Sequence, residues 1–250
     1  MKKFGLLGRK LQHSYSPKIH KYFGEYEYLL YEKEPEELSS FLKNLDLDGL
    51  NVTIPYKKEV IKHCTNLSAK AKSIGAVNTI IKEKNGELTG YNTDYYGFLY
   101  MLNTINASVK NKKAIVLGSG GASLTCQTVL DDLGAKEIVV ISTKSEENNY
   151  LNIQKHFDAQ IIVNATPVGM YPKVNECLID LKKFKKCEAV LDLIYNPSQT
   201  LLLKQANELE IKNANGLSML IAQAKQSAEL FTLKEIDDSI IDEITKDFII

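Results

Sequence analysis

The 250-residue sequence contains no tryptophan and only four cysteines. The cysteines lie far apart and form no CxxC pair, a spacing typical of neither a zinc site nor a disulfide framework. We therefore expect no bound metal, and we expect reduced thiols in the cytoplasm. The four positions are Cys64, Cys126, Cys177 and Cys187.

The sequence also lacks an excess of positive or negative charge, because Lys plus Arg and Asp plus Glu both number 31. Such a balance predicts no nucleic-acid or membrane partner. No apolar run approaches the length of a membrane span, and the N-terminus turns glycine-rich at Gly5 and Gly8, too soon for the apolar core of a signal peptide. The remaining composition, 44% hydrophobic and 25% charged, is that of a soluble globular protein long enough for two domains.

Strand-like and helix-like stretches alternate through the first hundred residues. Asn85-Gly86 separates the last two of these strands and is a strong hairpin signal. We predict an α/β fold whose first unit has a mostly parallel sheet with an antiparallel edge. Strands are expected over 4–7, 28–31, 50–54, 77–81 and 88–91, and helices from Pro17, over 35–42 and over 69–74.

A second α/β unit begins with a strand over 112–118 that runs into Gly118-Ser-Gly-Gly-Ala-Ser123. A helix to Leu133 and a strand over 137–141 follow. Glycines in such a turn let the backbone approach a pyrophosphate, which the N-terminus of the next helix binds. This context predicts a Rossmann dinucleotide-binding unit. Later strands are expected over 160–164, 189–193 and 211–214, before a long helix from Gly216 through Phe231.

The end of the second Rossmann strand indicates which dinucleotide binds. An acidic side chain there would bind the ribose of NAD and repel a 2′-phosphate. The residues are Ser142-Thr-Lys144, and no acid occurs before Glu146. Hydroxyls and one cation favour NADP, and NAD remains an alternative because Lys144 is a single flexible charge.

The stretch 49–57 suggests proton chemistry. A strand over 50–54 ends at Pro55, a residue suited to the first turn of a helix. We therefore expect Lys57 in that first turn, where the positive end of the helix dipole disfavours a cation. A lysine so placed is a candidate acid or base. A solvated lysine beside Lys58 is the alternative that this stretch leaves open.

Asp94 is a second candidate. Asn92-Thr-Asp94 leaves the hairpin and begins a helix that runs through Phe98 and Leu102. A carboxylate at or near the N-cap is favoured by free N–H groups and by the dipole. Capping alone would explain this aspartate unless other polar residues converge on it.

Two serines and one glutamine are candidates for ligand binding. Ser16 is expected to cap the helix that begins at Pro17, which leaves Ser14 free to donate outward. Turn formation explains both serines equally well. Gln223 lies beside the apolar face of the last long helix, either as an amide bonded to backbone or as a ligand contact.

Together these motifs resemble the shikimate dehydrogenase family. The resemblance covers nearly the whole chain in unbroken order, which makes it highly specific. The matching segments are His13-Ser-Tyr-Ser-Pro17, Asn51-Val-Thr-Ile-Pro-Tyr-Lys57, Gly75-Ala-Val-Asn-Thr79, Asn92-Thr-Asp94, Gly118-Ser-Gly-Gly-Ala122, Asn164-Ala-Thr-Pro-Val-Gly-Met170, Tyr195-Asn-Pro197 and the helix from Gly216 to Gln223.

The resemblance implies an activity and an architecture. The family reduces 3-dehydroshikimate to shikimate with NADPH, reversibly, in the route to chorismate and the aromatic amino acids. A discontinuous substrate domain, residues 1–97 plus 216–250, is then expected around a central NADP-binding Rossmann domain, residues 98–215. The active site is expected in the cleft between these domains.

The resemblance also implies residue roles. Lys57 and Asp94 would form the catalytic pair, with Lys57 as the acid/base and Asp94 orienting it. Substrate contacts would come from Ser14, Ser16, Thr53, Asn78, Tyr195 and Gln223. Cofactor contacts would come from Gly118, Ser119, Gly120, Gly121, Ala122, Ser142, Thr143, Lys144, Thr166 and Gly216.

Three features depart from the family's pattern. Ser142-Thr-Lys144 stands where Asn-Arg-Thr is usual, and Tyr95 stands where a glycine commonly follows Asn-Thr-Asp. The C-terminal helix lacks the common tryptophan, with Leu233-Lys234 in that region. None of these departures affects the expected catalytic pair.

Two other functions remain open. One is a quinate/shikimate dehydrogenase that prefers NAD, and the other is a non-catalytic metabolite sensor on the same fold. Binding alone would not require both Lys57 and Asp94, so their presence favours an enzyme. The expected partner is a small-molecule substrate, and the chain is expected to be a monomer or a homodimer.

Overall fold

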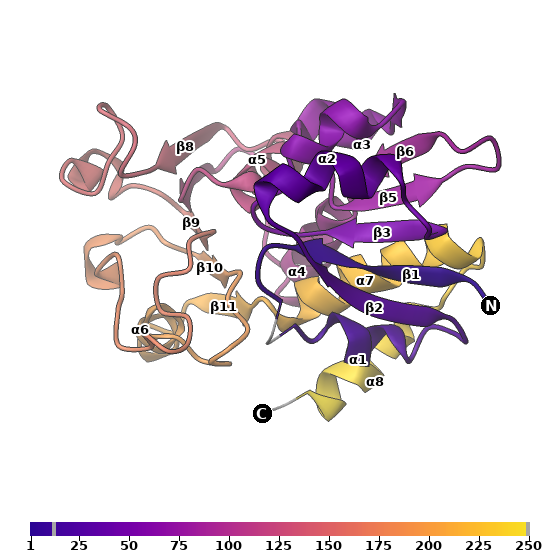
Figure 1. Ribbon diagram of the computed structural model, residues 1–250. Coiled ribbons are helices and arrows are strands. Elements are labelled where there is room, and N and C mark those ends of the chain that lie inside the picture. Colours follow the sequence, from indigo (N-terminus) through magenta and orange to yellow (C-terminus); the bar gives the residue numbers. More distant parts are fainter. Residues whose placement is uncertain (12–13, 249–250) are drawn as a thin grey trace. The chain divides into compact units, whose positions relative to one another are not determined.

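The computed structural model describes residues 1–11 and 14–248, which form two compact α/β units (Figure 1). The first unit contains Met1–Tyr96 and Ile221–Asp247, and the second contains Gly97–Leu220. The chain thus leaves the first unit and returns to it near its C-terminus. The contacts divide the chain at 96/97 and 220/221, whereas the sequence-based boundaries lie at 97/98 and 215/216.

The first unit is built on a six-stranded sheet with the order β2-β1-β3-β5-β6-β4. Only β5 runs against the other strands, so the predicted mostly parallel sheet is confirmed. The predicted antiparallel edge is wrong, because β6 and the short β4 extend the sheet beyond β5 and leave it internal. The strands are β1 (Lys3–Gly8), β2 (Glu27–Glu32), β3 (Gly49–Val52), β4 (Asn66–Leu67), β5 (Thr79–Lys82) and β6 (Leu88–Tyr91).

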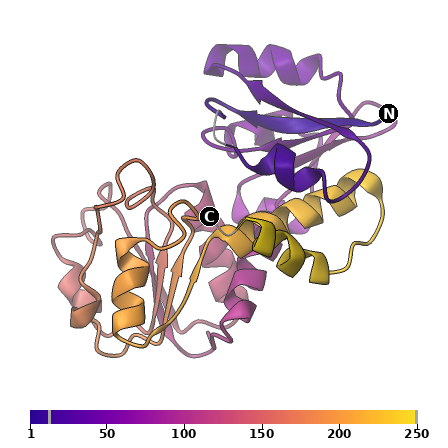
Figure 2. The ribbon, with the colours of Figure 1, turned by 90° about the horizontal axis from the view of Figure 1, so that it is seen from below.

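Helices cover both faces of this sheet (Figures 1 and 2). On one face, α2 (Pro35–Lys43) and α3 (Ala69–Ile74) bury Leu38, Leu42 and Ala71 against the strands. On the other face lie α1 (Ser16–His20) and α7 (Leu217–Thr232), where Phe231 stacks on Phe4 with ring centroids 4.2 Å apart. The sheet therefore has an apolar layer on each side, as a mostly parallel sheet requires.

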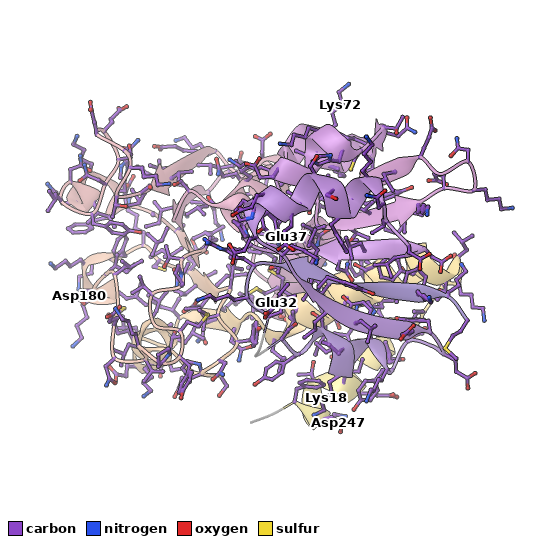
Figure 3. All side chains as sticks on the ribbon, in the orientation of Figure 1. Lys18, Glu32, Glu37, Lys72, Asp180 and Asp247 are labelled. Atoms are coloured by element: carbon purple, nitrogen blue, oxygen red, sulfur yellow. The ribbon has the colours of Figure 1, made fainter. Side chains whose placement is uncertain are left out.

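Local signals account for where several helices begin. The helix α2 starts with a capping box, in which the side chains of Glu34 and Glu37 each accept the other's backbone N–H. Of these two residues, Figure 3 labels Glu37. Ser68 caps α3, and Gly75 ends it in the left-handed conformation that glycine adopts readily. The C-terminal helix α8 (Ser239–Asp247), which the sequence analysis did not predict, buries Ile241 and Ile244.

The second unit is built on a five-stranded parallel sheet with the order β11-β10-β9-β7-β8. The chain reverses its direction of travel across the sheet between β7 and β9, the position where Rossmann-type sheets bind nucleotides at the carboxyl ends of their strands. The strands are β7 (Lys113–Leu117), β8 (Glu137–Ile141), β9 (Ile161–Asn164), β10 (Ala189–Asp192) and β11 (Lys212–Asn215).

The helices α5 (Gly121–Asp132) and α6 (Leu201–Glu208) flank this sheet on opposite faces (Figure 2). The connections from β8 to β9 and from β9 to β10 contain only the short 3₁₀ helices Ile153–His156 and Leu181–Lys183. These 3₁₀ helices still contribute side chains such as Leu181 to the hydrophobic core of the second unit. In the described part of the chain, no helix combines the length and apolar character needed to cross a bilayer.

Candidate active site

Lys57 and Asp94 meet in the first unit. The Lys57 Nζ donates to Asp94 Oδ2 at 2.6 Å, and the two side chains are 17% and 8% exposed. A hydrogen bond between two ionised groups in a largely dry environment is shorter and stronger than a neutral one. The alternative of a solvated lysine does not describe Lys57, although it does describe its exposed neighbour Lys58.

The predicted helix around Lys57 is wrong. Residues 54–58 form turns, and a 3₁₀ helix follows only at Glu59–His63. The reason is a long-range contact, because the carbonyl of Lys57 accepts the N–H of Val77 at 2.7 Å instead of a helical donor. The buried ring of Tyr56, whose hydroxyl donates to the carbonyl of Lys33, fixes the turn from the other side.

Asp94 is the first residue of α4 (Asp94–Thr104), as predicted. The Tyr95 N–H is accepted by the side chain of Asn92 at 3.2 Å, which leaves the Asp94 carboxylate for Lys57. Asn92 also donates to the carbonyl of Ala76 at 3.0 Å. The N–H of Thr93 donates to Asn78 Oδ1 at 2.7 Å.

The segment 76–78 therefore positions both members of the pair. On one side the N–H of Val77 donates to the carbonyl of Lys57. On the other side the carbonyl of Ala76 accepts from the Asn92 side chain, and Asn78 Oδ1 accepts the N–H of Thr93, just before α4. Ala76, Val77 and Asn78 are all nearly completely buried, so this segment has little freedom to move. A rigid support of this kind holds reacting groups in one geometry.

The other candidates of the first unit lie on neighbouring segments. Thr53 directly follows β3 and is partly exposed, and Asn78 directly precedes β5. Asn78 Nδ2 donates to Gln223 Oε1 on α7 at 3.4 Å, so these two amides are adjacent. The Gln223 amide thus has at least one side-chain partner, and its role as a ligand contact stays a prediction.

The serine pair differs from expectation in one respect. Ser16 does not cap α1, because it is the first residue of that helix and Tyr15 occupies the cap position without a side-chain bond. Instead, Ser14 Oγ accepts the N–H of Ser16 at 3.3 Å. Ser14 is the acceptor in this contact, and Ser16 is nearly buried. His13, the first residue of this motif, lies outside the described residues.

Four further polar residues belong to the same cluster, and the sequence analysis did not single them out. Their side chains are buried and hydrogen-bonded to one another or to Asn78. The sequence could have indicated each of them, because three lie inside the motifs named above and the fourth lies one helical turn after Gln223. These residues are Asn51, Thr79, Thr93 and Ser227.

The glycine-rich turn of the second unit fits a dinucleotide. Gly118 has a φ of +101°, and a Cβ there would lie 2.8 Å from Thr166 Cγ2, so glycine is required. Gly120 has open space where a side chain would project. The helix α5 follows with no side-chain cap and no acid in its first turn, which leaves N–H groups that can bind a pyrophosphate through the turn 118–122.

The loop after β8 is tied to this turn. Ser142 Oγ lies 3.0 Å from Ser119 Oγ and accepts the N–H of Lys144 at 3.2 Å. Ser142 is buried, whereas Thr143 and Lys144 are exposed. The one cation of the loop can thus reach a ligand at the carboxyl end of the sheet, and the nearest acids, Glu146 and Glu147, follow later in the chain.

Gly216 has a packing role independent of any cofactor. A Cβ at this position would lie 2.0 Å from the carbonyl oxygen of Leu193, and the Gly216 N–H donates to the carbonyl of Ile194 at 3.0 Å. The backbone at the start of α7 therefore passes directly over the loop after β10. Tyr195, the remaining substrate candidate, lies partly exposed in that loop, in the second unit.

Asp192 organises two of these loops. It is fully buried at the end of β10 and accepts from Asn164 Nδ2 at 2.9 Å, Thr200 Oγ1 at 2.6 Å and the Ile194 N–H at 3.1 Å. Asn164 in turn accepts from the Thr166 hydroxyl at 2.7 Å. Burial raises the pKa of Asp192 to about 6, although these hydrogen bonds favour the ionised form.

This raised pKa predicts a pH-dependent stability. A carboxyl that binds its proton more tightly in the folded state stabilises the fold at low pH, and that contribution is lost as the pH rises through about 6. The free energy of unfolding of the wild type, minus that of Asp192→Asn, should therefore fall by about 2 to 3 kcal/mol between pH 4 and pH 7. Urea titrations across this range measure the difference, and a difference that is constant or rises with pH would contradict the assignment.

Among the described residues, no group of three or more His, Cys, Asp or Glu side chains could hold a metal ion. The candidate site groups are instead an ammonium–carboxylate pair beside buried amides and hydroxyls, and a glycine-rich turn suited to a dinucleotide.

Comparison with known proteins gives consistent matches. Residues 6–80 match the family described as the shikimate dehydrogenase substrate binding domain. The chain is 38% identical to the shikimate dehydrogenase (NADP(+)) of Clostridium beijerinckii, over 96% of this chain and 95% of that protein.

Solved structures agree with these matches. A chorismate mutase/shikimate 5-dehydrogenase fusion protein from Clostridium acetobutylicum superposes with a TM-score of 0.91 at 39% identity, covering 98% of this chain and 96% of that one. The shikimate 5-dehydrogenase of Thermus thermophilus, in complex with NADP(H) and shikimate, has a TM-score of 0.87 at 30% identity, with 99% of each chain covered.

Proposed function

We infer that this chain, which belongs to the shikimate dehydrogenase family, is an NADP-dependent oxidoreductase that reversibly reduces 3-dehydroshikimate to shikimate in the shikimate pathway. The observation that carries the chemistry is the contact of Lys57 Nζ with Asp94 Oδ2 at 2.6 Å, inside a cluster of buried amides and hydroxyls. A sensor that only bound its ligand would have no need of this pair.

Lys57 acts as the acid and base of the reaction. In reduction its ammonium donates a hydrogen bond to the oxygen of the 3-oxo group and then gives that oxygen a proton. In oxidation the neutral amine takes the proton from the hydroxyl. Asp94 orients Nζ and balances its charge, so that the proton donor points in one direction. NADPH, when bound, supplies the hydride.

Substrate recognition follows from donor and acceptor types. The hydroxyls of Ser14 and Ser16 suit the substrate's carboxylate, because each can donate to an anion. The amides of Asn78 and Gln223 can both donate to and accept from ring hydroxyls, and Thr53 offers one more hydroxyl. Tyr195 of the second unit is the remaining proposed contact.

The cofactor is NADP, and the second unit offers residues suited to it. The turn 118–122 and the N-terminus of α5 would hold the pyrophosphate, and Thr166, held by Asn164, is proposed to contact the cofactor near the β9 loop, with Gly216 close by. Ser142, Thr143 and Lys144 would bind the 2′-phosphate.

Steady-state kinetics test the proposed function. Purified protein should oxidise shikimate with NADP, and the rates with NAD and with quinate measure how selective the site is. Binding of shikimate without any reduction of NADP or NAD would overturn the enzyme and favour a sensor. A preference for quinate and NAD would instead favour a quinate/shikimate dehydrogenase.

Lys144→Glu is expected to shift cofactor preference from NADP toward NAD. The substitution replaces the one cation of the loop with a charge that repels a 2′-phosphate, so the KM for NADP should rise by roughly one to two orders of magnitude while the KM for NAD changes much less. The matched control is Lys136→Glu, the same change in an exposed lysine just before β8. Equal kinetics for Lys144→Glu and the wild type would show that Lys144 does not meet the phosphate.

We further propose that the chain acts in the cytoplasm as a monomer or a homodimer. The widely spaced cysteines suit a reducing compartment. Cell fractionation tests the location, and light scattering on the eluted protein tests the assembly, where any state beyond a dimer would contradict the proposal.

A further inference from the structure

Buried polar side chains form a continuous hydrogen-bonded network inside the first unit. At its centre is Asn51 on β3, which is 5% exposed. The Asn51 amide nitrogen donates to Thr79 Oγ1 at 3.0 Å and to Ser227 Oγ at 2.8 Å. The Asn51 amide oxygen accepts from the hydroxyl of Tyr28 at 2.7 Å. The same amide nitrogen also donates to the backbone carbonyl of Asn78 at 3.4 Å, so both ends of the Asn51 amide are hydrogen-bonded.

Tyr28 carries the network to the serine pair. The side chain of Ser16, one helical turn before His20 on α1, interacts with the Tyr28 hydroxyl. The Tyr28 ring stacks on the imidazole of His20, with centroids 3.9 Å apart and planes 13° apart. Burial lowers the pKa of His20 to about 3, against a hydrogen bond to Asn51 that acts in the opposite direction, so His20 is an uncharged ring at neutral pH. The stack fixes the Tyr28 ring, and the ring fixes its hydroxyl between Ser16 and Asn51.

From Asn51 the network also extends to the side-chain amides of Asn78 and Gln223. Ser227 Oγ lies 3.0 Å from Thr93 Oγ1. Asn78 Nδ2 donates to Thr93 Oγ1 at 3.0 Å and to Gln223 Oε1 at 3.4 Å. Every link in this path from Ser16 to Gln223 lies within the first unit.

Such a network does more than fill space. Burying polar groups lowers stability unless each finds a partner, and apolar side chains would fill the same volume without that requirement. Hydrogen bonds in a connected network depend on one another, so the orientation of a group at one end is linked to that at the other. The two ends here are the groups proposed to bind opposite parts of the substrate.

We propose that Tyr28 is a positioning residue for the substrate: its hydroxyl joins Ser16, at the carboxylate-binding end, to Asn78 and Gln223, at the hydroxyl-binding end. Ser16 has one proton to donate. Tyr28 holds the Ser16 hydroxyl in place before binding, and the substrate's carboxylate accepts the hydrogen bond from that hydroxyl when it arrives. The inference rests on the proposed function, since it concerns how the same site recognises its substrate.

Tyr28→Phe tests this role without disturbing the stack on His20. The change should raise the KM for shikimate roughly three- to thirtyfold, because preorganised binding groups lose their fixed orientation. The KM for NADP should stay within about twofold, and kcat should change much less than the KM, because Lys57 and Asp94 keep their contact. A purely structural role would lower the melting temperature without this selective change in KM.

The matched control is Tyr22→Phe. Tyr22 follows α1 and its hydroxyl donates to Asp247 (labelled in Figure 3) at 2.7 Å, a surface contact with no link to Asn51. This variant loses one tyrosine hydroxyl and one hydrogen bond from the same region. It should leave both KM values unchanged.

A double-mutant cycle with Ser16→Ala shows whether Tyr28 acts through Ser16. Once Ser16 has lost its hydroxyl, Tyr28→Phe should raise the KM for shikimate by a clearly smaller factor than it does in the wild type. Should Tyr28→Phe fold poorly, Ser227→Ala enters the network from its other end and should raise the same KM.

The outcomes distinguish a failure of the proposed function from a failure of the role given to Tyr28. No oxidation of shikimate by the wild type would overturn the proposed function and this inference with it. An active wild type whose KM for shikimate is unaffected by Tyr28→Phe, or whose Tyr28 and Ser16 effects multiply without coupling, would overturn this inference alone. A selective and coupled rise in the KM for shikimate supports it.

Discussion

Lys57→Ala is expected to lower kcat for shikimate oxidation by roughly two to four orders of magnitude, the effect of removing a positioned acid or base. The KM for shikimate should change much less, because the proposed hydroxyl and carboxylate contacts come from other residues. The structure strengthens this expectation, since the Lys57 side chain is largely buried and its Nζ is bonded to Asp94. Steady-state rates with saturating NADP provide the measurement.

The neighbouring lysine supplies the control for this prediction. Lys58→Ala removes the same side chain one residue later, from an exposed position. We expect wild-type kinetics from it. If Lys57→Ala instead raised the KM greatly and kept its kcat, Lys57 would be a binding residue and another group would have to transfer the proton.

Asp94→Asn is expected to lower kcat by roughly one to three orders of magnitude, because the amide cannot balance or orient the Lys57 ammonium as a carboxylate does. The loss of one partner also leaves a largely buried charge unpaired, so the melting temperature should fall. The control is Asp242→Asn, which removes a carboxylate from the first turn of α8 at an exposed position. This control separates the loss of the ion pair from the general effect of a charge at a helix N-terminus.

The double variant shows whether the pair acts as a unit. Lys57→Ala combined with Asp94→Asn should be about as impaired as Lys57→Ala alone, since Asp94 has no lysine left to orient. Effects that multiplied in full would indicate that Asp94 acts on the substrate independently of Lys57.

Much of the fold followed from local patterns in the sequence. The glycine-rich turn before α5, the hairpin at Asn85-Gly86 and the start of α4 at Asp94 are all where the sequence analysis placed them. Each depends on interactions between residues close in the chain, such as backbone freedom at glycine or the spacing of apolar side chains. The mostly parallel pairing of the strands could be predicted for a similar reason, because alternating strands and helices favour it.

Two expectations failed where distant residues determine the backbone. The carbonyl of Lys57 bonds to Val77 and not to its own helix, and β6 and β4 place β5 inside the sheet. Patterns within a few residues carry no information about such partners. The expected cap failed for a local reason instead, because Ser16 is itself the first residue of α1 and its N–H donates to Ser14.

The sequence by itself determined the family and the two α/β units, and it singled out Lys57 and Asp94 as the candidate pair, because these inferences depend on residue types in a fixed order. Only the tertiary structure decided that segment 76–78 supports both members of the pair. It also revealed the path of hydrogen bonds from Tyr28 through Asn51 to Ser227. The physical reason is that a buried hydrogen bond forms between groups that folding brings together, and Tyr28, Asn51 and Ser227 lie far apart along the chain.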